Sequence, residues 1–326
     1  MKELYPLKFN PLFKDKIWGG DKIKSVLGLD YSPLPNCGEA WVLSGVENNE
    51  TIVSDGWLQG NHLNELLEIY MDDLVGEKLF ERYRNEFPLL IKLLDANDWL
   101  SIQVHPNDEL AKKRHNGSGK TEMWYILQAD QNAQLISGFN QEMTKEKYLD
   151  FLNSNKLPQI MNFEKVSPND VFYMPSGRVH ALGPGILLAE IQQTSDITYR
   201  MYDWDRVDSE GKARDLHTDL ALDAIDFKVY DDHRIQSQTH PDQATLLMES
   251  PYFITNKLLL TKPLIRDYSE LDSCVIYLCV NGLANIEYSG GNISIKTGEC
   301  ILVPALTNIT KIIPKSETNI LEIFPL

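Results

Sequence analysis

The sequence has few cysteines, no long apolar run and no excess of positive charge. Its four cysteines form no C-x-x-C pair and lack the dense, even spacing of a disulfide-rich secreted domain, so we expect a reduced, cytoplasmic protein. No stretch approaches the roughly 18 apolar residues of a membrane span, and the N-terminal segment lacks the apolar core of a signal peptide. The formal net charge of −16 argues against nucleic-acid or membrane partners, so an anionic substrate requires a local basic pocket.

Length and composition indicate a globular protein of two compact units. Hydrophobic residues make up 43% of the 326 residues, which is ample for a core. A chain of this length exceeds what one core usually organises, about 250 to 300 residues. Short apolar runs rich in β-branched and aromatic residues predict a mostly β fold. These runs cover residues 88–94, 100–105, 121–127, 171–175, 186–193, 275–280, 300–304 and 319–324.

Helical periodicity is confined to three segments, at about residues 61–83, 144–155 and 215–227. We interpret them as insertions that form a small helical cap on the β framework. Prolines, charges and weak periodicity predict a junction near residue 235, which divides the chain into units 1–235 and 236–326.

The two units share a short motif. Residues 170–175 and 299–304 each consist of an acidic residue, four mostly apolar residues and a proline. Five residues after its proline the first copy has His180, whereas the second has Ile309. We therefore expect two related β-barrels, of which the C-terminal one is degenerate and lacks metal ligands.

Side chains with metal-binding groups alternate along two predicted strands. Side chains i and i+2 of a strand point to the same face, so Gln103 and His105 share one face, as do Lys120 and Glu122 on the other strand. Either pair alone is more often an ordinary polar pair. Together with His180 from a proline-glycine turn, Gln103, His105 and Glu122 form a set of oxygen and nitrogen ligands that suits zinc best.

Charged residues accompany these ligands. Lys120 shares a face with Glu122, so we expect it to point into the same cavity and to hold a phosphate or stabilise charge on oxygen. A lone basic residue is otherwise a solvated strand end, and for Arg178, which lies in a turn, the two interpretations weigh equally. Acids and bases near a Lewis-acidic metal suit proton transfer next to a carbonyl. The remaining candidates are Lys92, Glu190, Asp196 and Arg200.

Several segments together resemble the class I (type I) mannose-6-phosphate isomerases, particularly their short bacterial form. Each segment alone is a weak signal, but their order and spacing are specific, and they span nearly the whole chain. The segments are Ile17–Gly20, Gly38–Trp41, the strand around Lys92, Leu100–Pro106, Lys120–Glu122, His180–Ala181, Ser195–Arg200 and Leu216–Asp223. Two departures stand out: Gly119 takes the place of a histidine of longer relatives, and their large helical insertion is missing.

The resemblance implies a fold of two cupin-type (jelly-roll) β-barrels, with one zinc ion per chain in the N-terminal barrel. The implied zinc ligands are Gln103, His105, Glu122 and His180. Lys120 and Arg200 are implied in substrate binding and catalysis and Ser101 in substrate binding, while Lys92, Glu190 and Asp196 resemble further active-site residues.

The implied reaction is the reversible interconversion of D-mannose 6-phosphate and D-fructose 6-phosphate, in which a proton moves between C1 and C2 through a cis-enediol. Lys92, Glu190 and Asp196 are all open as the base. Two alternatives stay open as well: a metal-dependent cupin oxygenase and a bicupin that binds a sugar without transforming it. We expect a cytoplasmic enzyme of mannose metabolism, either a monomer or a homodimer.

Overall fold

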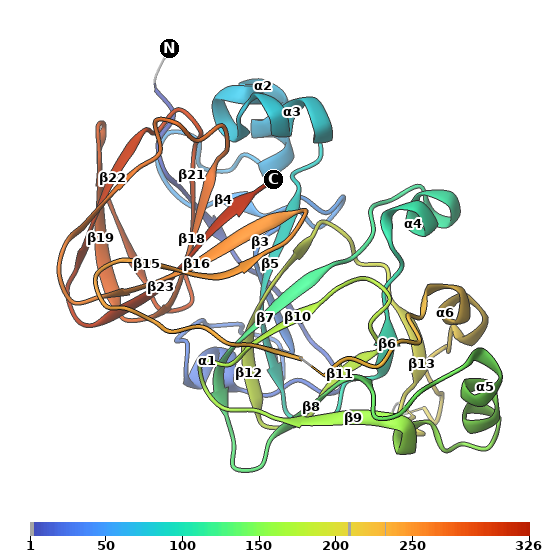
Figure 1. Cartoon of the computed structure of the whole chain (residues 1–326). Helices are drawn as coiled ribbons and strands as arrows, with labels where there is room; N and C mark the ends of the chain where they lie inside the picture. The colour runs from blue at the N-terminus through green and yellow to red at the C-terminus, as the bar shows by residue number, and fades with distance from the viewer. Residues whose placement is uncertain (1–2, 208–209, 232) are drawn as a thin grey trace.

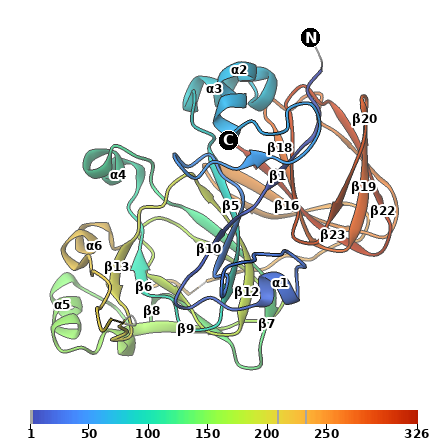
Figure 2. The ribbon, with the colours of Figure 1, turned by 180° about the vertical axis from the view of Figure 1, so that it is seen from behind.

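Two β-barrels lie side by side, with helices at their periphery (Figures 1 and 2). The computed structural model describes residues 3–207, 210–231 and 233–326. Each barrel combines one large and one small sheet. The mostly β fold predicted from the apolar runs is confirmed, because every predicted run contains a strand.

The first barrel has a seven-stranded sheet in the order β14-β10-β7-β12-β5-β3-β2 and a five-stranded sheet in the order β13-β6-β11-β8-β9. Its strands are β2 (Leu12–Lys14), β3 (Glu39–Leu43), β5 (Leu89–Ala96), β6 (Ile102–Val104), β7 (Glu122–Ala129), β8 (Gln134–Phe139), β9 (Met161–Lys165), β10 (Val171–Met174), β11 (His180–Leu182), β12 (Ile186–Gln193), β13 (Tyr199–Tyr202) and β14 (Arg234–Ile235).

The second barrel has a seven-stranded sheet in the order β15-β16-β23-β18-β21-β1-β4 and a four-stranded sheet in the order β17-β22-β19-β20. Its strands are β1 (Leu7–Asn10), β4 (Ile52–Val53), β15 (Ala244–Glu249), β16 (Phe253–Leu260), β17 (Leu264–Asp267), β18 (Val275–Asn281), β19 (Leu283–Tyr288), β20 (Gly291–Lys296), β21 (Cys300–Val303), β22 (Ile309–Pro314) and β23 (Thr318–Pro325).

All three predicted helical segments contain helices: α2 (Leu63–Val75) with α3 (Glu77–Tyr83), α5 (Lys145–Asn153) and α6 (Thr218–Ala224). Three helices of the described residues were not predicted: the short α1 (Lys22–Ser25), α4 (Asp108–His115) and the 3-10 helix η1 (Leu157–Ile160). Helix α4 buries only Ala111 and so lacks an apolar stripe. The sequence features that favour α4 lie at its two ends. The Asn107 side chain caps the first turn, which contains acidic residues, and the last turn contains basic residues. None of the described helices is both long and apolar enough to cross a bilayer.

The first strand of the chain belongs to the second barrel. Strand β1 pairs with β21 at Leu7 and Leu302, and helix α2 is tied to the same barrel by backbone hydrogen bonds from Cys274 and Ala305. Figure 1 shows α2 and α3 at the top of the view, next to the upper end of the orange second barrel. The boundary near residue 235 stays a prediction. Strand β1 and helix α2 come before it in the chain, but they contact the second barrel.

The large sheets of the two barrels share one apolar core. Side chains from one face of the first sheet, such as Met123 and Ile191, pack in a single cluster with Ile276 and Leu321 of the second barrel. The alternate residues of those strands point into the barrel instead. Both faces of β5, β7 and β12 are therefore buried, so each charged residue on them lies in the interior and needs a partner.

Candidate active site

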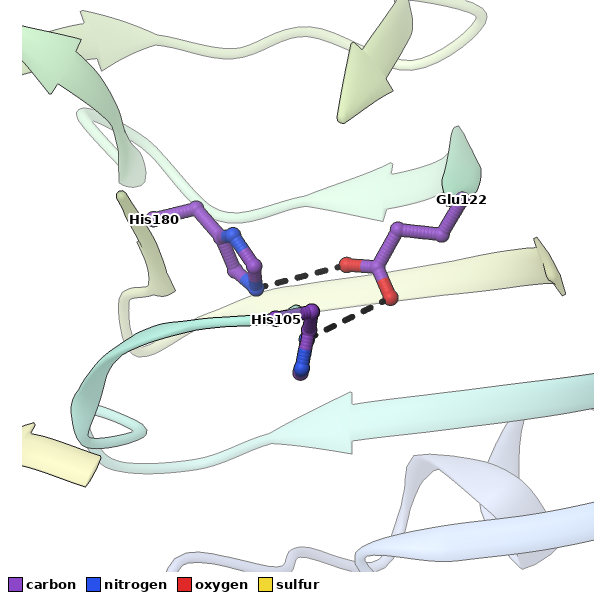
Figure 3. Close-up of side chains that lie close together, drawn as sticks. All are labelled: His105, Glu122 and His180. Carbon is purple, nitrogen blue, oxygen red and sulfur yellow. Dashed lines mark ion pairs between the residues drawn. The ribbon is translucent and has the colours of Figure 1, made fainter. Parts of the chain in front are cut away.

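Three ligand-type side chains converge inside the first barrel (Figure 3). His105 follows β6, Glu122 begins β7 and His180 begins β11, and each is at most 1% exposed. Their candidate ligand atoms all lie within 4.8 Å of one another. Nε2 of His180 is 3.4 Å from Glu122 Oε1, and Nε2 of His105 is 3.7 Å from Glu122 Oε2.

Backbone carbonyls set the tautomers of both histidines. Nδ1 of His105 lies 2.9 Å from the Ile197 oxygen, and Nδ1 of His180 lies 2.8 Å from the Arg178 oxygen. A carbonyl oxygen only accepts, so each Nδ1 carries the hydrogen and each Nε2 has a lone pair, which faces Lys120 Nζ in His105 and Gln103 Nε2 in His180. Burial, reinforced by the Lys120 ammonium, lowers the pKa of His105 well below its ordinary value and that of His180 to about 4, so both rings are neutral at pH 7.

The donor set fits a metal cation. Two imidazole rings and a carboxylate lie close to one another, and Glu122 Oε1 is buried without a hydrogen-bond partner among the described residues. Burial, with the nearby Glu190 carboxylate adding to it and Lys120 opposing it, raises the pKa of Glu122 to about 7. A cation among these three groups would give Glu122 Oε1 a partner and would favour the ionised form of the carboxyl group. Two nitrogens with one oxygen suit a borderline metal such as zinc.

Gln103 lies beside this group but turns its amide the other way. It pairs with His180 across β6 and β11, and its Nε2 is 3.3 Å from His180 Nε2. Its Oε1 accepts a hydrogen bond from Ser101 Oγ at 3.2 Å. Ligation by Gln103 therefore requires the amide to rotate so that its two atoms exchange places.

Acids and amines alternate in a buried row next to the candidate ligands. Lys120 donates to Glu122 and lies 3.8 Å from Glu190, whose other neighbour, Lys92, is 3.2 Å away. Lys92 in turn lies 3.9 Å from Glu39. These residues stand on adjacent strands, because Glu190 on β12 pairs with Lys92 on β5, which pairs with β3.

Indole groups and a further lysine complete this row. Trp124 Nε1 donates to Glu190 at 2.9 Å, and Trp41 Nε1 donates to Glu39 at 2.7 Å. Lys16 lies 3.2 Å from Glu39 at the more exposed end. Sequence reasoning missed Lys16, Glu39 and Trp41 as members of the site, although the segment Gly38–Trp41 belonged to the resemblance.

The row determines the charge of its members. Burial favours neutral Lys92, but the Glu190 and Glu39 carboxylates outweigh it and raise the pKa of Lys92. Burial likewise favours a neutral Glu190, but Lys120, Lys92 and the Trp124 hydrogen bond lower its pKa to about 2. Lys92 is therefore an ammonium and Glu190 a carboxylate at neutral pH.

A cavity of about 270 Å³ opens over these groups. Of the predicted residues that line it, Asp196 is exposed and forms no hydrogen bond or ion pair with any residue that the structure describes. Arg178 lies elsewhere, with its guanidinium 4.3 Å from the Tyr230 ring, and it touches the site only through its carbonyl oxygen. The predicted residues in the cavity wall are Lys92, Ser101, Gln103, Lys120, His180, Glu190, Asp196 and Arg200.

Two arginines make part of the cavity wall basic. Arg200 donates to the Asp215 carbonyl oxygen at 2.8 Å, while its buried Nε has no partner among the residues described. Burial, with Arg214 as the largest charged contributor, lowers the pKa of Arg200. Arg214 and Arg206 share one carboxylate, Asp203. Arg214 was not predicted, since nothing in its sequence surroundings marks it.

Comparisons with known proteins agree with this geometry. The family model described as phosphomannose isomerase type I, catalytic domain, matches residues 6–147. The mannose-6-phosphate isomerase ManA of Bacillus subtilis is 41% identical over 256 residues, covering 77% of this chain and 78% of the relative. The chain belongs to the type I phosphomannose isomerase family. Another family member, the mannose-6-phosphate isomerase of Streptococcus mutans, is 36% identical over 77% of this chain and 78% of its own length.

Solved structures match the fold over its whole length. The crystal structure of the mannose 6-phosphate isomerase from Bacillus subtilis has a TM-score of 0.88 at 31% identity, covering 98% of this chain and 99% of that chain. A putative mannosephosphate isomerase from Archaeoglobus fulgidus has a TM-score of 0.78 at 19% identity over 98% of this chain and 97% of its own, which shows the fold alone. The predicted two-barrel cupin fold is confirmed.

Proposed function

We propose that this chain is a metal-dependent aldose–ketose isomerase that interconverts D-mannose 6-phosphate and D-fructose 6-phosphate. The observation that carries the proposal is one cavity in which His180 of the candidate metal centre meets the row of acids and amines and an arginine-lined wall. The names of the curated relatives support the same reaction.

Gln103, His105, Glu122 and His180 would hold the metal, and zinc fits this donor set best. A zinc ion held there would supply Lewis acidity to the oxygens of the open-chain sugar. Lys120, which reaches His105 Nε2 at 3.2 Å, places an ammonium next to those oxygens and offsets negative charge that develops on the enediol. After the Gln103 amide has rotated, its nitrogen would face Ser101 Oγ, and the hydroxyl would position Gln103 by accepting a hydrogen bond from it.

Asp196 is the base that we assign to the proton transfer between C1 and C2. Lys92 is kept protonated by two carboxylates, so it cannot accept a proton. Glu190 is a carboxylate of low pKa, with Lys92 and Trp124 bound to its oxygens, which makes it a weak base. Asp196 faces the cavity with both oxygens free of partners among the described residues.

The substrate phosphate binds at Arg200 and Arg214. The positive charges of Lys16 and Lys92 are neutralised by Glu39 and Glu190. That end of the cavity therefore carries no net positive charge that would attract a phosphate. Arg200 forms no ion pair with any carboxylate that the structure describes, and its Nε has no hydrogen-bond partner there. A fork of guanidinium donors matches the geometry of a phosphate.

We also propose that the enzyme holds one zinc ion per chain and works in the cytoplasm as a monomer or homodimer. All four cysteines are free thiols and buried, which suits a reducing compartment.

The reaction is tested by coupling fructose 6-phosphate formation to NADPH production, with mannose 6-phosphate as substrate. Turnover should stop after chelation and return when zinc is added back. Unphosphorylated mannose should react far more slowly, because it cannot engage the arginines. A zinc-loaded protein that forms no fructose 6-phosphate refutes the proposal, and oxygen consumption would indicate the oxygenase instead.

The base is tested by comparing Asp196→Asn with Glu190→Gln. Asp196→Asn should lower kcat by roughly 100- to 10,000-fold and abolish exchange of the C2 hydrogen with deuterated solvent, at unchanged metal content. Exchange that persists in Asp196→Asn but disappears in Glu190→Gln would transfer the role to Glu190.

A further inference from the structure

Nine strands of the first barrel correspond one to one with nine strands of the second. In chain order, β3 and β5 to β12 match the nine strands β15 to β23. The sheet orders agree as well, since β10-β7-β12-β5-β3 matches β21-β18-β23-β16-β15, and β6-β11-β8-β9 matches β17-β22-β19-β20. Even a pairing irregularity recurs, between Trp41 and Leu43 in β3 and between Leu246 and Met248 in β15.

Register places Glu322 of the second barrel where the first barrel has Glu190. Glu190 on β12 pairs with Trp124 on β7, and Glu322 on β23 pairs with Tyr277 on β18. Both carboxylates lie in the interior, with exposures of 3% and 0%. The equivalent of Glu122, two residues before the aromatic residue, is the buried Val275.

The correspondence between the two barrels extends to their small sheets. His180 lies edge-on to Trp124 with ring centroids 5.3 Å apart, and Thr310 Oγ1 lies 2.9 Å from the Tyr277 hydroxyl. Thr310 is therefore the counterpart of His180. The sequence comparison had placed Ile309 there, but the turn after β21 is one residue longer and Ile309 is 54% exposed.

Arg266 then takes the position of Gln103. Gln103 pairs with His180 across β6 and β11, and Arg266 pairs with Thr310 across β17 and β22. Two residues further along, Tyr268 stands where the first barrel has His105. Each candidate metal ligand of the first barrel thus has a counterpart in the second that cannot ligate zinc in the same way.

The guanidinium of Arg266 provides positive charge in this second site. Its Nε donates to Glu322 Oε1 at 2.7 Å and its Nη2 to Oε2 at 3.0 Å. Tyr268 and Asn256 donate the remaining hydrogen bonds to the same carboxylate, at 2.6 and 2.9 Å. A carboxylate with no exposed surface requires such compensation.

We propose that the second barrel contains a cation-binding site built on the same framework as the metal centre, and that Arg266 occupies it as an internal ligand. The ligand class of this site is a planar guanidinium, which matches the bidentate geometry at Glu322 and the hydrogen-bonding groups around it. The inference is independent of the proposed reaction.

The test removes the internal ligand and supplies it in solution. Arg266→Ala should lower the Tm by roughly 4 to 7 °C, because it leaves Glu322 buried and unpaired. Guanidinium chloride at millimolar concentration should then raise the Tm of this variant, by roughly 2 °C at ten times its Kd. Sodium chloride at the same ionic strength and the wild-type protein provide the reference.

Two further variants make the result specific. Lys311→Ala removes a cation from the exposed pair with Glu287 in the same barrel, and its Tm should not respond to guanidinium. Arg266→Ala combined with Glu322→Gln should not respond either, because the carboxylate that binds the cation is gone. If Arg266→Ala alone does not fold, guanidinium during refolding should restore soluble protein where sodium chloride does not.

An unchanged Tm in Arg266→Ala overturns the proposal. So does a lowered Tm that guanidinium fails to raise, or soluble protein that guanidinium fails to restore. An equal response of all variants would mean a general salt effect and would equally refute the site.

Discussion

Replacing Lys92 by methionine tests the buried row most directly. Its ammonium lies 3.2 Å from Glu190 and 3.9 Å from Glu39, and the three side chains are only 8%, 5% and 13% exposed. At an effective dielectric constant of about 20, each attraction is worth about 4 to 5 kcal/mol before the cost of burying the ammonium is subtracted. Methionine keeps the length of the side chain but leaves both carboxylates without this partner.

We expect Lys92→Met to lower the free energy of unfolding by about 3 to 5 kcal/mol at pH 7.5, the range for breaking a buried ion pair. Urea unfolding of the zinc-free protein measures this value. Lys16→Met is the matched control, because Lys16 is 35% exposed and its pair with Glu39 contributes about 1 kcal/mol or less. Adding Glu190→Gln to Lys92→Met should recover part of the loss.

The loss should also depend on pH. In the wild-type protein the pKa of Glu190 is lowered to about 2. Its stabilising contribution is therefore present above the unfolded pKa of about 4.3 and disappears as the pH falls toward 2. Without Lys92 that pKa rises, so the variant regains stability when the carboxyl takes up a proton, and the loss is smaller at pH 5 than at pH 8. Any of three results refutes the reasoning: a loss below about 1 kcal/mol, a loss equal to that of Lys16→Met, or a loss that does not change with pH.

Three other predictions concern the metal centre. Lys120→Met should retain bound zinc, measured by elemental analysis, while kcat falls by roughly 100-fold or more, and loss of the metal would contradict the placement of Lys120. His180→Ala should weaken zinc binding by more than the roughly 10- to 100-fold typical of outer-shell changes, as measured by chelator competition, and full affinity would remove His180 from the ligand set. Zinc affinity of the wild-type protein should fall by about tenfold per pH unit below pH 7, because the pKa of Glu122 is raised to about 7 and the metal must displace that proton. A zinc titration at pH 5.5 to 8 with constant affinity would contradict the placement of Glu122.

Much of the candidate site was predictable because its signals are local. The two-residue period of a strand shows that Gln103 and His105 share a face, and the same holds for Lys120 and Glu122. The structure places these side chains close to His180. Local patterns also predicted eight of the strands and three helical segments, whereas α4 was missed because it buries a single side chain.

The partners across the sheet were not predictable in this way. Strand period says which face a residue occupies, but it does not say which strand lies next to it. The row through Glu39, Lys92 and Glu190 exists only because β3, β5 and β12 are adjacent. Arg178 illustrates the opposite case, since its charge lies outside the cavity although His180 follows two residues later.

The sequence by itself determined the strand pattern, the candidate ligand set and the family, because alternation and motif spacing are properties of the chain. Only the tertiary structure decided the charge of Lys92 and Glu190 and the pairing of Arg266 with Glu322. Each of these depends on residues distant in sequence that meet at a few ångströms inside a barrel. Electrostatic interactions at that range are set by distance and burial, which only the folded chain defines.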